Sequence, residues 1–359
     1  MFRLSPPATL CVVRLSSVGD TCHALAVVRA IQDTWPETRI TWIIGKAEAA
    51  LLSDIADIEF IIFDKSAGTA AYREIRQHLR GRSYDAVLCM HASLRANLIY
   101  PLIRSRHKIG YDFARARDGQ WLLTRHRIPP VPRQHVLDGM MAFARCIGVG
   151  ERPLRWDIPL SDAHRDFAAQ YRSEHRPLFL ISPCSSQRSR NYRNWSVENY
   201  AAAARHALHK FNCRVLITGG TSAIENDYGQ AITRLAGGGV ENLVGQTTLK
   251  QLLALIDAAD ALLCPDSGPA HLATAVRTPV IGLYATSNPD RTGPYLCRDL
   301  TINAYPEASR TFLGKEPGAL RWGERVREPR AMGLIRLGRV NAAIDALFSP
   351  AAGVVNLSR

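Results

Sequence analysis

The chain has 359 residues, of which 47% are hydrophobic and 21% charged, and this length exceeds one compact core and suits two α/β domains. No apolar run approaches the roughly 18 residues that span a bilayer, and the first residues lack the pattern of a signal peptide. The eight cysteines stand singly without a C-x-x-C pair, which argues against a zinc site or a redox pair. We therefore expect a cytoplasmic protein with structural cysteines.

The first half alternates β-branched runs with amphipathic stretches, a pattern typical of a parallel sheet covered by helices. Strands are predicted at 10–15, 39–44, 59–63 and 86–90. Helices are predicted at 21–34, 46–53, 70–81, 94–104 and 135–148. Gly148 suits the C-cap of the last of these helices. The polar stretch that follows, with Pro153, Pro159 and Pro177, is interpreted as an interdomain linker.

The second half repeats this alternation, with strands at 178–182, 213–218, 261–264 and 279–284 and helices at 196–209, 222–235, 248–258, 268–276 and 337–347. The fold class is therefore α/β, with two Rossmann-like domains whose ligands bind beyond the carboxyl ends of the strands. The expected boundaries are 1–155 for the N-terminal domain, 156–176 for the linker, 177–335 for the C-terminal domain, and 336–359 for a final helix that packs back toward the N-terminal domain.

The formal net charge of +13 is unevenly distributed along the chain. The segment from Arg95 to Val136 contains nine Lys or Arg residues but only two acidic residues, Asp112 and Asp118. This segment is either a solvated basic surface or the contact for an anionic substrate or membrane face. No nucleic-acid-binding motif accompanies the charge, so we expect no nucleic-acid partner.

The turn after the first predicted strand reads R-L-S-S-V-G-D at 14–20. Gly19 allows the backbone to approach a ligand closely, and hydroxyl and N–H groups at a helix N-terminus suit an anion. Asp20 has two interpretations at this place. It is either a helix cap, a position that Asp fills well, or a functional carboxylate that faces the ligand.

Two polar turns follow strands in the second half. The first, S-P-C-S-S at 182–186, precedes three arginines, and these groups either hold phosphate oxygens or form a basic loop without a ligand. The second, T-G-G-T at 218–221, is followed by Glu225. An acid near such a turn can bind ribose hydroxyls, although a glycine pair alone is a weak signal.

The sharpest motif is D-S-G-P-A-H at 266–271, directly after a buried strand. Gly268 allows a tight turn, and Pro269 suits the first turn of a helix. The N–H groups at that helix start suit a diphosphate. His271 lies in the same first turn. We interpret it as a site residue rather than as a satisfied core histidine.

These motifs together resemble glycosyltransferase family 9, the ADP-heptose:lipopolysaccharide heptosyltransferases. The resemblance extends to K-I-G-Y-D at 108–112, A-R-D-G-Q at 116–120, R-N-W at 193–195 and S-N-P-D-R-T-G-P-Y at 287–295. It rests on the order and spacing of the motifs, since no single one is decisive. It implies a GT-B fold, with two facing Rossmann-like domains and an interdomain cleft. It also implies inverting transfer of a heptose from ADP-heptose to the inner core of lipopolysaccharide.

The resemblance also assigns roles to individual residues. Asp20 is the catalytic general base. The donor-binding residues are Ser185, Ser186, Arg193, Glu225, Asp266, Ser267, Gly268 and His271. The acceptor-binding residues are Ser17, Gly19 and Arg117. The chain departs from the family pattern in three places. Ala270 stands where Met is usual, and the loop before Arg193 looks longer, so that Arg190 could take the phosphate role instead. An extended segment over 307–327 suggests a subgroup.

No D-x-D cluster lies where a metal would be expected, so we expect no cofactor and no essential metal. The expected partners are the nucleotide-sugar donor, an anionic acceptor (lipopolysaccharide inner core or lipid A), and the cytoplasmic face of the inner membrane, where the protein would be peripherally associated. Four alternatives remain open: another nucleotide sugar, another acceptor, a non-hydrolysing epimerase of the same fold, and a non-catalytic scaffold in core assembly.

Overall fold

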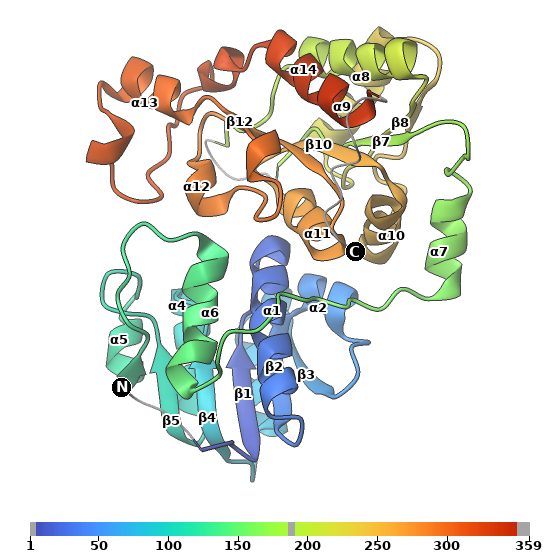
Figure 1. Ribbon diagram of the computed structural model, residues 1–359. Helices are drawn as coiled ribbons and strands as arrows, with labels where there is room; N and C mark the ends of the chain where they lie inside the picture. Colours follow the sequence, from blue (N-terminus) through green and yellow to red (C-terminus); the bar gives the residue numbers. More distant parts are fainter. Residues whose placement is uncertain (1–4, 186–190, 350–359) are drawn as a thin grey trace. The chain divides into compact units, whose positions relative to one another are not determined.

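The computed structural model describes residues 5–185 and 191–349 (Figure 1). The chain divides into two compact units, Met1–Pro159 and Leu160–Arg359. The division falls inside the stretch that the sequence marks as the linker.

The first unit is built on a parallel sheet in the order β3-β2-β1-β4-β5-β6. Its strands are β1 (Thr9–Val13), β2 (Arg39–Gly45), β3 (Ile58–Phe63), β4 (Tyr84–Cys89), β5 (Ser105–Gly110) and β6 (His126–Arg127). The first four confirm the predicted strands, whereas the last two were not predicted. The direction in which strands are added reverses between β1 and β4. Ligands of doubly wound sheets bind at the carboxyl edge of such a switch point.

Helices cover both faces of this sheet, and α1 packs beside α6 (Figure 1). They are α1 (Val18–Thr34), α2 (Lys46–Leu52), α3 (Thr69–His78), α4 (Leu94–Asn97), α5 (Gln120–Leu123) and α6 (Val136–Ile147). Gly148, with φ of 107°, is the C-cap of α6 as predicted. The helix predicted at 94–104 ends early, because Pro101 lacks an N–H group and disrupts a helix interior. A 3₁₀ turn at Tyr100–Leu102 takes its place.

The second unit repeats the plan with the parallel order β12-β11-β10-β7-β8-β9. Its strands are β7 (Leu178–Ile181), β8 (Arg214–Ile217), β9 (Val240–Asn242), β10 (Ala261–Pro265), β11 (Val280–Tyr284) and β12 (Ile302–Asn303). The switch point lies between β7 and β10. The predicted α/β class is therefore confirmed in both units.

The helices of the second unit are α7 (Asp162–Ala169), α8 (Val197–Phe211), α9 (Ala223–Ala236), α10 (Leu249–Ala258), α11 (Gly268–Val276), α12 (Pro289–Thr292), α13 (Tyr305–Leu313) and α14 (Leu337–Phe348). Further 3₁₀ turns lie at Lys65–Ala67, Arg298–Leu300, Pro317–Ala319 and Ala331–Leu334. Among the described residues, no helix combines the length and apolar character that crossing a membrane requires.

The C-terminal helix α14 packs on α8 of the second unit (Figure 1). Its expected return toward the N-terminal domain stays a prediction. Val340 and Ile344 are fully buried in the core of this unit. Asp345 pairs with two side chains of α8, at 2.7 Å from His206 Nε2 and 2.8 Å from Lys210 Nζ. The apolar side of the helix is therefore already covered within the second unit.

Candidate functional site

Asp20 lies in the first turn of α1, at the carboxyl edge of the first sheet. Ser17 is the N-cap of this helix, and its backbone N–H and its hydroxyl both donate to Asp20 Oδ2, at 3.4 and 3.1 Å. The same oxygen lies 2.5 Å from Arg14 Nη2. Asp20 therefore does help to close the helix start, although Ser17 is the cap residue. Its carboxylate is at the same time fixed by an ion pair and one-third exposed.

Arg14 is a buried residue that sequence reasoning did not single out. Its Nη1 donates to the carbonyl of Met90 at 2.7 Å, so its guanidinium connects the end of β1, the residue after β4 and Asp20. A buried arginine must be paired, because an isolated charge is costly to desolvate. An arginine directly after an apolar strand was the available signal. Met90 lies 76 residues further along the chain, and Asp20 lies beyond a turn whose geometry the sequence does not give, so neither partner could be named from sequence alone.

His91 and Glu48 are further titratable groups near Asp20. Burial, reinforced by the charge of Arg14, lowers the pKa of His91 to about 3. Its Nδ1 accepts the backbone N–H of Leu15 at 3.2 Å, which requires the neutral ring. Burial raises the pKa of Glu48. Of these three groups, the partly exposed carboxylate of Asp20 is thus the one best placed to meet a solvent-borne substrate.

The other predicted acceptor residues lie at the same edge of the sheet. Gly19 is buried in the first turn of α1. Arg117 is exposed in the loop between β5 and α5. Asn97 of α4 holds this loop, because its Nδ2 donates to the carbonyls of Arg117 and Asp118 at 3.1 and 2.8 Å. The Arg117 side chain is therefore carried by an anchored backbone.

In the second unit the fold brings Arg193 and Asp266 together from positions 73 residues apart. Arg193 Nη1 lies 2.8 Å from the carbonyl oxygen and 3.3 Å from the Oδ2 atom of Asp266. Both side chains are largely buried, at 11% and 7% exposed. Trp195 anchors the loop, since its buried indole N–H donates to the carbonyl of Ile335 at 3.1 Å. Two predicted donor residues are thus neighbours at the switch point of the second sheet.

Ser185 lies in the same turn and is buried. The Ser185 hydroxyl accepts a hydrogen bond from Asn191 Nδ2 at 2.6 Å, and the Ser185 backbone N–H donates to Asn194 Oδ1 at 3.0 Å. Asn191 Oδ1 also accepts from Arg193 Nε at 2.8 Å, so the two asparagines, which sequence reasoning missed, shape the loop. Ser186 lies outside the described residues, as do Arg188 and Arg190.

Glu225 lies near the start of α9, where Ser222 is the N-cap. Its Oε1 accepts the backbone N–H of Gly220 at 2.8 Å, and its Oε2 accepts the Ser222 hydroxyl at 2.5 Å. The carboxylate therefore closes the glycine turn after β8. Its predicted ribose contact stays a prediction.

The D-S-G-P-A-H motif forms the junction of β10 and α11 as predicted. Ser267 is the N-cap of α11, but its hydroxyl turns to the carbonyl of Pro265 at 3.0 Å and makes no cap bond to the helix. Gly268 is the first helical residue, and His271 follows half-buried in the first turn. The positive end of the helix dipole, with N–H groups that its cap side chain does not use, thus lies beside Arg193 and Asp266.

Arg325 is a second arginine at Asp266, and sequence reasoning missed it. Its Nη2 lies 3.9 Å from Asp266 Oδ2. Two hydrogen bonds fix the segment that carries Arg325. The N–H of the buried Val326 donates to the carbonyl of Thr286 at 3.0 Å, and the Tyr305 hydroxyl donates to the carbonyl of Glu324 at 2.8 Å. The extended segment over 307–327 therefore returns to the carboxyl edge of the second sheet, beside Asp266. The only sequence signal was an arginine next to an apolar residue.

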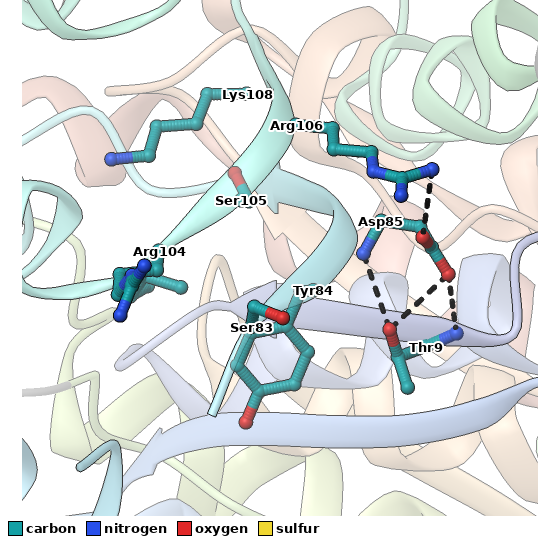
Figure 2. Close-up of a pocket in the computed structure, with 9 residues that line it drawn as sticks. Thr9, Ser83, Tyr84, Asp85, Arg104, Ser105, Arg106 and Lys108 are labelled. Carbon is teal, nitrogen blue, oxygen red and sulfur yellow. Dashed lines mark hydrogen bonds and ion pairs between the residues drawn. The ribbon is translucent and has the colours of Figure 1, made fainter. Parts of the chain in front are cut away.

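A surface pocket lies at the opposite, amino-terminal edge of the first sheet (Figure 2). It is lined by Thr9, Ser83, Tyr84, Asp85, Ile103, Arg104, Ser105, Arg106 and Lys108. Asp85 is engaged within it, since its Oδ2 accepts the Thr9 N–H at 3.0 Å and its Oδ1 lies 3.9 Å from Arg106. None of the predicted site residues lines this pocket. Among the described residues no group of three or more His, Cys, Asp or Glu side chains could hold a metal ion.

Two Rossmann-like units in one chain, with an aspartate at the switch point of one and paired arginines at the switch point of the other, are the architecture of a GT-B glycosyltransferase. The chain belongs to glycosyltransferase family 9 (heptosyltransferase), whose model matches residues 72–314. The family, the GT-B fold and the enzyme class expected from the sequence are thereby confirmed.

Individual relatives agree with this assignment. The chain is 41% identical to the lipopolysaccharide core heptosyltransferase OpsX of Haemophilus influenzae, over 91% of this chain and 93% of the relative. The structure of Escherichia coli ADP-heptose lps heptosyltransferase II matches with a TM-score of 0.69 and 20% identity, over 95% of this chain and 98% of the other. The E. coli heptosyltransferase WaaC with ADP-2-deoxy-2-fluoro heptose matches with a TM-score of 0.65 and 20% identity, over 83% and 98%.

Proposed function

We propose that this enzyme transfers a heptose from ADP-heptose to the inner core of lipopolysaccharide, with inversion at the anomeric carbon. The similarity to a lipopolysaccharide core heptosyltransferase over 91% of the chain supports the substrate pair. The observation that carries the chemistry is the cluster at the start of α11, where Arg193 and Arg325 flank Asp266.

This cluster suits the donor diphosphate. Arginine binds phosphate oxygens through paired N–H donors, and a helix N-terminus attracts negative charge. As the bond between the anomeric carbon and the diphosphate breaks, negative charge grows on the departing ADP. Preorganised donors aimed at such developing charge are commonly the largest catalytic contribution. In this proposal Asp266 holds the two guanidinium groups in place, and Ser267, Gly268 and His271 complete the turn.

The acceptor side requires a base. In the proposed step a hydroxyl oxygen of the acceptor forms the new bond to the anomeric carbon, and Asp20 takes its proton. A positioned base of this kind contributes about 10² to 10⁴ in rate. Arg14 and Ser17 fix the carboxylate that receives the proton. Arg117 supplies a positive charge for the anionic acceptor, as the sequence resemblance implies.

We propose further that the reaction needs no metal ion, because arginines and helix N–H groups meet the charge of the leaving group. Full activity after extensive treatment with EDTA is the expected result. Activity that is lost with EDTA and restored by a divalent cation would contradict this part of the proposal. We also propose that the protein works at the cytoplasmic face of the inner membrane, where its acceptor is anchored.

The test is a transfer assay that follows nucleoside diphosphate release from a panel of nucleotide sugars, with and without heptose-deficient lipopolysaccharide. ADP release that needs both ADP-heptose and the acceptor, with a heptosylated product, would support the proposal. Release from another donor would overturn the heptose assignment. An altered free sugar without acceptor would indicate an epimerase, and donor binding without any release would indicate a scaffold.

A further inference from the structure

Large apolar side chains are exposed on one part of the first unit. In the described part of the chain eight large hydrophobic residues are exposed, and six of them lie between residues 94 and 131. Five of the six belong to α4 and its C-cap, to α5, and to the loop that joins β5 to α5: Leu94, Leu98, Phe113, Trp121 and Leu122. Phe113 and Leu122 are the most exposed, at 67% and 71%. A concentration of this kind commonly marks an interaction surface.

These segments form one connected surface, which we call the α4–α5 face. The backbone N–H of Leu94 donates to Asp118 Oδ2 at 2.8 Å, which ties the start of α4 to the loop. The rings of Phe113 and Trp121 lie 6.3 Å apart between centroids. Arg127 connects the two, with its guanidinium 4.2 Å from the Phe113 ring centre and its Nη2 donating to the Trp121 carbonyl at 2.9 Å.

The charge of the α4–α5 face is positive. Arg95, Arg117 and Arg125 are exposed on it or at its margin, in addition to the Arg127 guanidinium. The two acidic residues of this stretch are both engaged internally, since Asp112 pairs with Arg115 and Asp118 accepts the Leu94 N–H. Exposed leucines and aromatic rings mixed with arginines are the composition of surfaces that insert into the headgroup region of an anionic bilayer.

We propose that the α4–α5 face docks on an anionic phospholipid bilayer. This inference rests on the proposed function and identifies the surface through which the enzyme reaches its acceptor. Arg117, one of the three predicted acceptor residues, lies in the loop that carries Phe113, so docking at this face would bring the acceptor site to the membrane surface. The apolar side chains enter the interface, while the arginines contact lipid phosphates and remain at headgroup level.

The test is flotation of the full-length protein with vesicles of phosphatidylethanolamine and phosphatidylglycerol, compared with vesicles of phosphatidylcholine. The wild type is expected to bind the anionic vesicles, and less so at high salt, because exposed charges are then screened. The double variant Phe113→Ser/Leu122→Ser is expected to lose at least ~tenfold in partitioning, because two large apolar side chains no longer leave water.

Ile62→Ser/Leu235→Ser is the matched control, since both residues are large, apolar and exposed (46% and 41%) but belong to other elements, β3 and α9. It is expected to bind vesicles like the wild type. Arg95→Glu/Arg125→Glu should lower binding to anionic vesicles by ~fivefold or more for each arginine, without lowering the residual binding to phosphatidylcholine. Equal loss in the apolar variant and its control, or no wild-type binding to anionic vesicles at low salt, would overturn the proposal.

A second readout separates this inference from the proposed function. ADP release with a soluble, deacylated acceptor needs no membrane. The Phe113→Ser/Leu122→Ser variant is therefore expected to keep the wild-type rate in that assay, which also shows that it is folded. Failure of the wild type with every soluble acceptor and donor would refute the proposed function but not the vesicle result. Vesicle binding that ignores the α4–α5 face would refute the inference and leave the transfer reaction standing.

Discussion

Replacement of Asp20 by asparagine tests the proposed base with the smallest change of shape. The asparagine Oδ1 can still accept the Ser17 N–H, so the start of α1 keeps part of its cap. The variant cannot take a proton from the acceptor hydroxyl. We therefore expect kcat to fall by about 10² to 10⁴, the usual contribution of a positioned base. The KM for the donor should change little, because the predicted donor residues lie in the second unit.

The same substitution removes the carboxylate that faces Arg14. Breaking a buried ion pair costs about 3–5 kcal/mol, whereas an exposed pair contributes about 0–1 kcal/mol. The side chains of Arg14 and Asp20 are 10% and 33% exposed, which places this pair between the two cases. We expect a loss of ~1–2 kcal/mol in the free energy of unfolding, after allowance for solvent screening of the carboxylate. Urea unfolding and the ADP-release assay at saturating substrate measure the two effects separately.

A matched control distinguishes catalysis from helix capping. In α10 the Thr248 N–H donates to Gln251 Oε1 at 2.9 Å, and the Gln251 N–H donates to Thr248 Oγ1 at 3.2 Å. Gln251→Ala removes the first of these two bonds at a cost of about 0.5–1.5 kcal/mol and should leave kcat unchanged. The reasoning is refuted if Asp20→Asn keeps most of the wild-type kcat. It is also refuted if Gln251→Ala loses as much activity for the same loss of stability.

Three further substitutions have expected outcomes. The folded-state pKa of His91 lies below its unfolded value, so the contribution of the neutral ring to stability is complete above pH 6.5 and declines as the pH falls toward 3. Between pH 7 and 5 the free energy of unfolding in urea should fall by roughly 2 kcal/mol more for the wild type than for His91→Gln. Equal losses in the two proteins would contradict this. Arg325→Ala should lower kcat/KM for the donor by ~10- to 100-fold, the value of a hydrogen bond to a charged group, whereas Arg321→Ala, on the same segment with a side chain 95% exposed, should not. Ile344→Ala should destabilise the protein by about 2–5 kcal/mol because it opens a cavity in the core, compared with little change for the exposed Leu235→Ala, and a small effect would argue that α14 is dispensable.

The central strands were predictable because they are apolar runs buried between helices. The parallel strands β1, β2, β7 and β10 are such runs, and their predicted ranges differ from the observed ones by a residue or two. The strand β5 was missed because its sequence, S-R-H-K-I-G, has a polar first half, and its side chains are only half-buried there. Its pairing with β4 comes from the tertiary fold and overrides weak local propensity.

The site was predictable where a turn carries its own signature, and less so where long-range contacts decide. The junction of β10 and α11 followed from the D-S-G-P motif itself. The contacts of Arg14 with Met90, and of Arg325 with Asp266, join residues 76 and 59 positions apart, and nothing local indicates them. The roles assigned to Glu225 and Ser185 remain predictions, because in the structure both side chains bind neighbouring groups of their own turns.

The hydrogen bond from Trp195 to the carbonyl of Ile335 has a consequence for biosynthesis. The loop that carries Arg193 is hydrogen-bonded to a residue that is synthesised 140 positions later, and Arg325 belongs to the same C-terminal part of the chain. Domains fold as units during synthesis, from the N-terminus onward. The first unit, which carries the proposed base, can therefore fold while the ribosome is still at work. The proposed diphosphate site of the second unit is completed only after residue 335 has emerged.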